Sequence, residues 1–108
     1  RSLGDLEFKK VDRLPAEEQM ITAFPDLKKE TLDRECEFMI IACDGVWDVM
    51  QNQEAVDFVR TRLNNDPTVK LSTIVEEIFE HCCAPTTETG LGCDNMTCII
   101  VQFIGLAQ

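Results

Sequence analysis

Basic side chains are scarce in this 108-residue sequence, in which 10 Lys and Arg face 20 Asp and Glu. The formal net charge is −10 at pH 7, and phosphate backbones and anionic lipid surfaces repel such a chain. No apolar run approaches the roughly 18–20 residues that cross a bilayer, and no basic-then-apolar signal peptide is present. We therefore expect no nucleic-acid partner, no membrane partner and an intracellular location, cytoplasmic or nuclear.

Histidine is limited to His81, and the sequence contains no internal repeat and no low-complexity tract. A single His without a supporting motif argues against Ser-His-Asp and Cys-His catalytic arrangements. The stretch Gly90-Leu91-Gly92 is too short for a phosphate-binding loop, and no Lys-Ser or Lys-Thr follows it. A plain divalent-ion-binding domain ranks low, because no EF-hand loop pattern occurs.

Cysteine, by contrast, is frequent, with six residues in the chain. Cys43 and Cys98 fall inside apolar runs, where a free thiol behaves as a small buried hydrophobe. The absence of a secretory signal favours reduced thiols over a disulfide framework. A zinc site is the alternative, although the paired C-x₂₋₄-C spacing of such sites is missing. Its candidate ligands are His81, Cys82, Cys83 and Cys93.

The hydrophobic pattern predicts strands over Gln19–Phe24, Phe38–Cys43 and Thr97–Ile104. The second strand is continuously apolar, which is typical of a strand covered on both faces. The pairing of the last strand with the second stays open between an antiparallel arrangement and a long crossover.

Two amphipathic helices are predicted between the second and the last strand. The first runs from Trp47 to about Asn64, with Asn52 as its N-cap. The second begins at Asp66-Pro67 and ends before Pro85. We therefore expect an α+β layer in which helices pack on one face of a sheet. The apolar stripe of the second helix consists of Leu71, Ile74, Val75, Ile78, Phe79 and Cys82.

Three acidic residues stand where predicted strands end or begin. Asp44 follows a buried apolar strand, and Asp48 comes four residues later, so a tight turn into a helix would bring both together. Asp94, beside Asn95, immediately precedes the last strand. Clustered carboxylates repel one another unless a hard cation such as Mg²⁺ or Mn²⁺ neutralises them. The spacing alone is more typical of simple turn and cap roles, and a metal site is the alternative that it leaves open.

At these residues the sequence resembles the C-terminal part of the metal-dependent protein serine/threonine phosphatases of type 2C. The matching segments occur in the family's order and span essentially all 108 residues. The stretch around Asp44 matches nearly residue for residue, and together with the motif at Asp94 it is highly specific. The segments are Arg1-Ser2-Leu3-Gly4-Asp5, Pro25-Asp26-Leu27, Phe38–Val49, Gln53-Glu54-Ala55-Val56 and Asp94-Asn95-Met96-Thr97.

The resemblance implies hydrolysis of phosphoserine and phosphothreonine in phosphoprotein substrates by a metal-activated water. It implies a binuclear Mg²⁺ or Mn²⁺ site at the edge of a four-layer α-β-β-α sandwich with antiparallel strands. Asp44 and Asp94 would be metal ligands, and Asp48 would help to hold a further, weaker ion. Asn95 and Gly45 would support the site.

The sequence departs from the family in its extent, because the N-terminal half of the catalytic domain is absent. That half carries the Asp-Gly-His-Gly motif, whose Asp bridges both metals, and the Arg that binds the substrate phosphate. We therefore expect residues 1–108 to be the C-terminal portion of such a domain, inactive alone. We expect it to pair with the missing half or to self-associate. The rival interpretation is a phosphatase-like interaction module that has lost catalysis.

Overall fold

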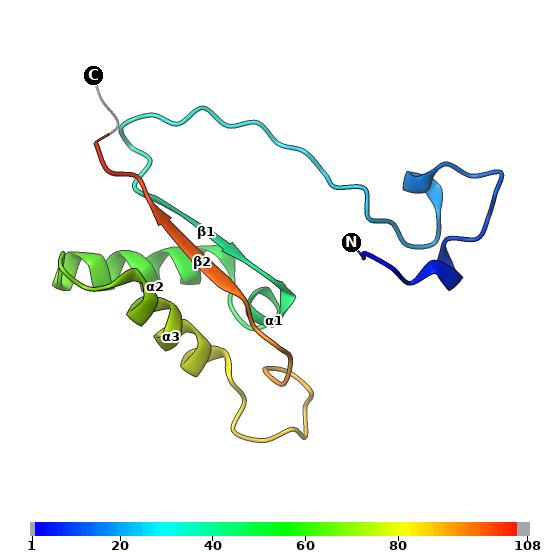
Figure 1. Ribbon diagram of the computed structural model, residues 1–108. Helices are drawn as coiled ribbons and strands as arrows, with labels where there is room; N and C mark the ends of the chain where they lie inside the picture. Colours follow the sequence, from blue (N-terminus) through cyan, green and yellow to red (C-terminus); the bar gives the residue numbers. More distant parts are fainter. Residues whose placement is uncertain (1, 106–108) are drawn as a thin grey trace. The chain divides into compact units, whose positions relative to one another are not determined.

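The computed structural model describes residues 2–105, and the chain forms two compact units, one within residues 1–31 and one within residues 32–108 (Figure 1). The 3-10 helices η1 (Leu6–Phe8) and η2 (Ala16–Glu18) belong to the first unit. All strands and α-helices of the described residues belong to the second unit. None of these helices combines the length and apolar character needed to cross a bilayer.

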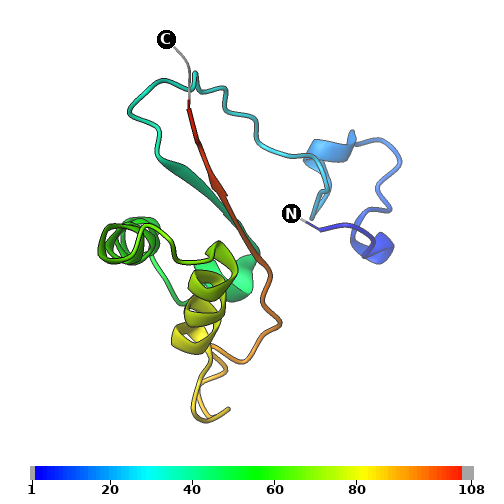
Figure 2. The same cartoon turned by 60° about the vertical axis from the view of Figure 1, so that its left-hand side comes forward.

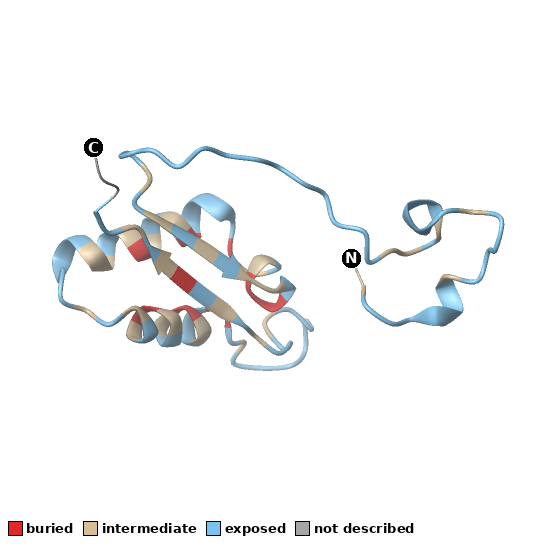
Figure 3. Ribbon diagram, turned by 45° about the horizontal axis from the view of Figure 1, so that its top comes forward, coloured by how far each residue is buried: buried red, intermediate tan, exposed pale blue. Residues whose placement is uncertain are grey.

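The first unit contains no strand in its described residues 2–31, so the predicted strand Gln19–Phe24 is wrong. A strand needs a neighbouring strand to satisfy its backbone groups. Instead, the Gln19 side chain donates hydrogen bonds to the Val11 and Leu14 carbonyls, both at 2.8 Å, and accepts one from the Val11 N–H at 3.1 Å. None of residues 2–31 is buried (Figure 3). Arg1, the first residue of the Arg-Ser-Leu-Gly-Asp motif, lies outside the described residues.

The second unit is built on a two-stranded antiparallel sheet. Strand β1 (Phe38–Ala42) pairs with β2 (Cys98–Gln102) so that Ile40 lies opposite Ile100. The long connection between them contains all three α-helices. The α+β class is therefore confirmed, and the pairing left open by the sequence is antiparallel.

The predicted first helix is in fact two helices. Helix α1 (Asp44–Trp47) directly follows β1, and α2 (Asn52–Asn65) begins after a short break. The N-cap of α2 is Gln51 rather than Asn52, and the Gln51 N–H lies 3.4 Å from the Glu54 carboxylate. Capping from position N3 stabilises the first turn because the free N–H groups gain a partner.

The second predicted helix begins later than expected, at Leu71 rather than Pro67. The Asp66 carboxylate accepts hydrogen bonds from the Thr68 hydroxyl at 2.6 Å and from the Thr68 N–H at 2.8 Å. These bonds lower the pKa of Asp66 and hold the segment in a turn that competes with the helix. Helix α3 therefore runs over Leu71–Cys82, with Lys70 as its N-cap.

The core lies between the helices and one face of the sheet. Figures 1 and 2 show α2 and α3 on the same side of the strands. Of the predicted α3 stripe, Ile74, Ile78 and Cys82 are buried, which confirms its orientation. The buried hydrophobic residues of the described chain are Val46, Met50, Ala55, Val59, Ile74, Ile78, Cys82 and Ile100.

The other face of the sheet carries apolar side chains that no described residue covers. Met39 is 44% exposed, Ile41 is 48% exposed and Ile99 is 52% exposed. Alternate positions of β1 are half-buried and exposed, so within the described residues only one of its two apolar faces is covered.

Replacing Ile78 with Ala should lower the free energy of unfolding by about 2–5 kcal/mol, because a fully buried side chain leaves a cavity in the core. Urea unfolding followed by Trp47 fluorescence measures the change. Glu76→Ala on the exposed face of the same helix is the control, and it should stay within about 0.5 kcal/mol of the parent. Equal effects of the two variants would contradict this core.

Candidate functional site

The antiparallel register brings the two acidic motifs to the same edge of the sheet. The last pair of the ladder joins Ala42 at the end of β1 to Cys98 at the start of β2. Just beyond it, the Cys43 N–H donates a 3.1 Å hydrogen bond to the Thr97 carbonyl. Asp44 therefore leaves one strand where the Asp94-Asn95 segment leads into the other. Sequence position placed each motif at a strand end, and the register places the two ends together.

Gly45 makes a close backbone contact between the two motifs. A Cβ built on Gly45 would lie 2.3 Å from the Asn95 carbonyl oxygen and 3.1 Å from its carbon. Only a residue without a side chain allows this approach, because real Cβ contacts are essentially never shorter than 3.0 Å. The glycine is required for close packing rather than for a positive φ, since its φ is not in that region. The contact between Gly45 and Asn95 thus holds the backbones of the two acidic motifs close together.

Helix α1 places Asp48 one turn after Asp44, and the Asp48 N–H donates a 2.8 Å hydrogen bond to the Asp44 carbonyl. Both side chains are exposed, as is that of Asp94, so Asp44 is not a buried carboxylate. The Asp44 carboxylate accepts a hydrogen bond from the Gly45 N–H at 3.1 Å, and that of Asp94 from the Asn95 N–H at 2.7 Å. Each interaction leaves carboxylate oxygens open to solvent.

The carboxylate oxygens at this edge of the sheet are suitable ligands for a hard cation, but they are few. No ion pair within residues 2–105 neutralises Asp44, Asp48 or Asp94. In the same residues no three His, Cys, Asp or Glu side chains come together as a metal-binding group. Mg²⁺ commonly uses one or two carboxylates and keeps several waters. The residues therefore fit part of a magnesium or manganese shell, and their assignment as ligands stays a prediction.

The cysteines are all free thiols. Burial raises the pKa of Cys82 and Cys98, which keeps both protonated at neutral pH. Among the residues considered for zinc, the His81 Nε2 lies 3.3 Å from the Glu54 carboxylate, and the Cys83 thiol is exposed. The described part of the chain shows no cluster of three such ligands.

Cys43 has a polar role that sequence reasoning missed. Its Sγ accepts a hydrogen bond from the Thr97 N–H at 3.2 Å and lies 3.5 Å from the Asn95 carbonyl oxygen, to which the thiol donates. The sequence suggested only a small apolar residue at the end of a strand. Its place directly before the Asp-Gly dipeptide was the available signal. Trp47 packs on the core and donates from its indole N–H to the Ala42 carbonyl at 2.9 Å.

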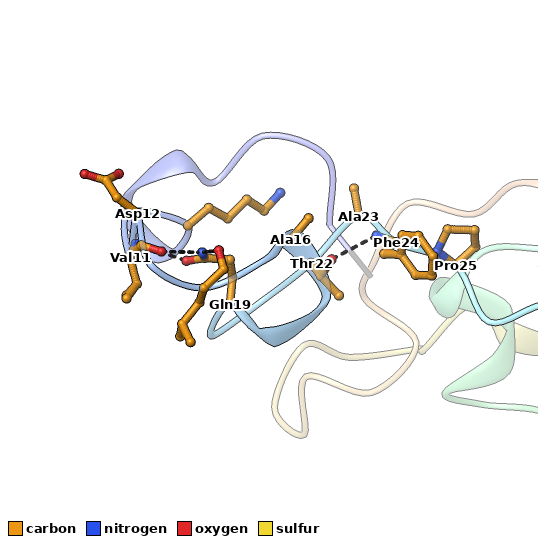
Figure 4. Close-up of a pocket in the computed structure, with 10 residues that line it drawn as sticks. Val11, Asp12, Ala16, Gln19, Thr22, Ala23, Phe24 and Pro25 are labelled. Carbon is orange, nitrogen blue, oxygen red and sulfur yellow. Dashed lines mark hydrogen bonds between the residues drawn. The ribbon is translucent and has the colours of Figure 1, made fainter.

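A separate open cleft lies in the first unit (Figure 4). Its volume is about 590 Å³, and Gln19, Phe24 and Pro25 are among its lining residues. Lys9 and Asp12 are its charged residues, and the Lys9 Nζ donates to the Ser2 carbonyl at 2.6 Å. None of the three predicted metal ligands lines this cleft.

Comparison with known proteins decides the family. The model of the family described as Protein phosphatase 2C matches residues 1–90. The chain belongs to the protein phosphatase 2C family. This confirms the resemblance that the motifs around Asp44 and Asp94 indicated. The match covers the whole Asp44 motif, and the Asp94 motif lies just beyond it.

Curated members of the protein phosphatase 2C family are similar over nearly the whole chain. A probable protein phosphatase of Drosophila melanogaster is 56% identical over 104 residues, which are 95% of this chain and 15% of that protein. Protein phosphatase 1G of Homo sapiens is 51% identical over 108 residues, covering 95% of this chain and 20% of that protein. Probable protein phosphatase 2C 21 of Arabidopsis thaliana is 50% identical, with coverage of 95% and 28%. The chain therefore spans less than a third of the length of these relatives.

Gly45→Ala should lower the free energy of unfolding by about 1–3 kcal/mol, because the new methyl group overlaps the Asn95 carbonyl and the packed backbone must shift. Thermal or urea unfolding measures this change. Gly90→Ala is the comparison, because a Cβ there meets nothing within 4 Å and only the positive φ of 72° is penalised. A Gly45→Ala variant as stable as the parent would refute the close contact of the two motifs.

Proposed function

We propose that this chain is part of a metal-dependent protein serine/threonine phosphatase that hydrolyses phosphoserine and phosphothreonine in proteins. Membership of the protein phosphatase 2C family supports the reaction class. The observation that carries the proposal is the close approach of Asp44-Gly45 to Asp94-Asn95 across the Gly45 contact. The chain would be the C-terminal portion of a catalytic domain, and its coverage of less than a third of its relatives' length is consistent with a portion.

In this proposal Asp44 and Asp94 would hold Mg²⁺ or Mn²⁺, and Asp48 would help to hold a further ion. When bound, these ions would screen the substrate phosphate and lower the pKa of a coordinated water. Screening matters here because a chain of formal net charge −10 repels a phosphate group. Asn95 and Gly45 would fix the backbone between the carboxylates. The remaining ligands of a binuclear site would come from outside this chain, because the described residues gather fewer than three.

Asp44→Ala or Asp94→Ala in the full-length protein should reduce hydrolysis of a phosphothreonine peptide at least about 100-fold. Even groups that only orient metal ligands affect activity by about 10–100-fold, and a lost ligand should cost no less. Asp57→Ala is the matched control, because Asp57 is an exposed acid on α2 whose carboxylate accepts a 2.9 Å hydrogen bond from the Gln53 side chain. Assays use Mn²⁺, with EDTA as a second control.

Near-normal turnover in both variants would defeat the ligand assignment. A full-length protein that hydrolyses no phosphopeptide with Mn²⁺ would favour the rival function, a phosphatase-like interaction module without catalysis. The chain alone should be inactive because its described residues hold an incomplete metal shell.

The same proposal also states what would cover the exposed face of the sheet. Met39, Ile41 and Ile99 would pack against a second sheet from the missing half of the domain, which would complete a four-layer α-β-β-α sandwich. Without that half, a second copy of the chain would cover the face. An apolar face of this kind is otherwise left in contact with water.

The purified chain alone should self-associate in a concentration-dependent manner, because association removes this face from water. Light scattering should detect species heavier than the 12.2 kDa monomer. Ile41→Lys should shift the chain toward the monomer, whereas Glu76→Lys on the exposed face of α3 should not. A monodisperse 12.2 kDa species at every concentration would refute the expectation.

A further inference from the structure

The hydrogen-bond pattern between β1 and β2 is irregular at the edge of the sheet that carries the acidic motifs. Residues 43 and 97 lie opposite each other immediately beyond Ala42–Cys98, the last pair of the ladder. The Cys43 N–H makes the expected bond to the Thr97 carbonyl at 3.1 Å. In a regular antiparallel pair the Thr97 N–H would return a bond to the Cys43 carbonyl. That carbonyl instead accepts from Val46 at 3.1 Å and from Trp47 at 3.3 Å, at the start of α1.

The Cys43 thiol takes the place of the Cys43 carbonyl as the acceptor for the Thr97 N–H, because that carbonyl bonds to α1. Its Sγ accepts from the Thr97 N–H at 3.2 Å, so the ladder extends by one pair although the backbone has already turned into the helix. The same thiol donates to the Asn95 carbonyl at 3.5 Å. One half-buried side chain thus satisfies a donor and an acceptor of the segment that follows Asp94.

The Asn95 carbonyl is held from two directions. The thiol of Cys43 approaches it on one side, and the Cα of Gly45 packs on it closely enough to exclude a methyl group. Asp44 lies between these two residues in the sequence, and Asp94 immediately precedes Asn95. The spacing of the two carboxylates therefore depends on where the Asn95 carbonyl is held.

We propose that Cys43 is a positioning residue, whose thiol holds the Asp94-Asn95 segment against the Asp44 segment and so sets the spacing of the two carboxylates. The effect on metal binding rests on the proposed function, whereas the effect on the segment itself does not. The required chemistry is one weak donor and one acceptor on a short side chain, which a hydroxyl also provides and a methyl group does not.

The experiment compares Cys43→Ala and Cys43→Ser in the full-length protein, with Cys98→Ala as control. Cys98 is an equally half-buried thiol on β2 for which no hydrogen bond is found within the described residues, so its removal measures the loss of packing alone. The first readout is amide exchange at Thr97 in the metal-free protein, resolved by NMR. The second is the dissociation constant for Mn²⁺, measured by electron paramagnetic resonance of the free ion.

Cys43→Ala should speed exchange at Thr97 by about tenfold, because the amide loses its acceptor. It should also weaken Mn²⁺ binding by about tenfold, as expected for residues that orient metal ligands. Cys43→Ser should stay within about threefold of the parent in both readouts because a hydroxyl keeps both bonds. Cys98→Ala should change neither readout beyond that range.

Unchanged Thr97 exchange in Cys43→Ala would overturn the proposal, and so would equal weakening of Mn²⁺ binding by Cys43→Ala and Cys98→Ala. Asp44→Ala separates this failure from failure of the proposed function. If that variant binds Mn²⁺ as the parent does, the ligand assignment is wrong. Thr97 exchange then still decides whether Cys43 holds the segment.

Discussion

The packing of the α3 apolar stripe on the inner face of the sheet supports the rest of the second unit. A two-stranded sheet is marginally stable in water by itself, and this one gains its stability from the helices on one side. Ile74 and Ile78 are fully buried against a core that includes Ile100 of β2. Because β1 and β2 lie far apart in the sequence, this core also fixes the register that brings the two acidic motifs together.

The candidate site depends on that register and on the hydrogen bonding of the Cys43 carbonyl. This carbonyl could accept a bond from the neighbouring strand or from the first turn of α1, and it accepts from α1. A thiol and a glycine then hold the neighbouring segment in place, at Thr97 and Asn95. The exposed carboxylates lie on this framework, and in the proposed function their open oxygens would bind the cations.

The sequence predicted the fold best where the hydrophobic pattern was clear and uninterrupted. The stripe of α3 and the positions of β1 and β2 were correct to within a few residues. Prediction failed where local hydrogen bonds decided the outcome. The Asx turn at Asp66 delayed α3, and the segment from Gln19 had no neighbouring strand with which to pair.

The candidate site was predictable as residue types but not as geometry. The strand-end positions of Asp44 and Asp94 were visible in the sequence, as was the Asp-Gly turn. Their meeting depends on a pairing across more than fifty intervening residues, which no local pattern specifies. The thiol contacts of Cys43 depend on the same pairing, so its polar role could not be read from an apolar run.

The uneven covering of β1 also determines what a mutational scan would detect. In this chain alone Met39 and Ile41 are exposed, so a screen for folding would score polar substitutions there as permissive. A screen of the complete protein would penalise the same substitutions if the proposed second sheet packs there. The difference between the two screens, position by position, would map the contacts that the proposed second sheet makes with β1.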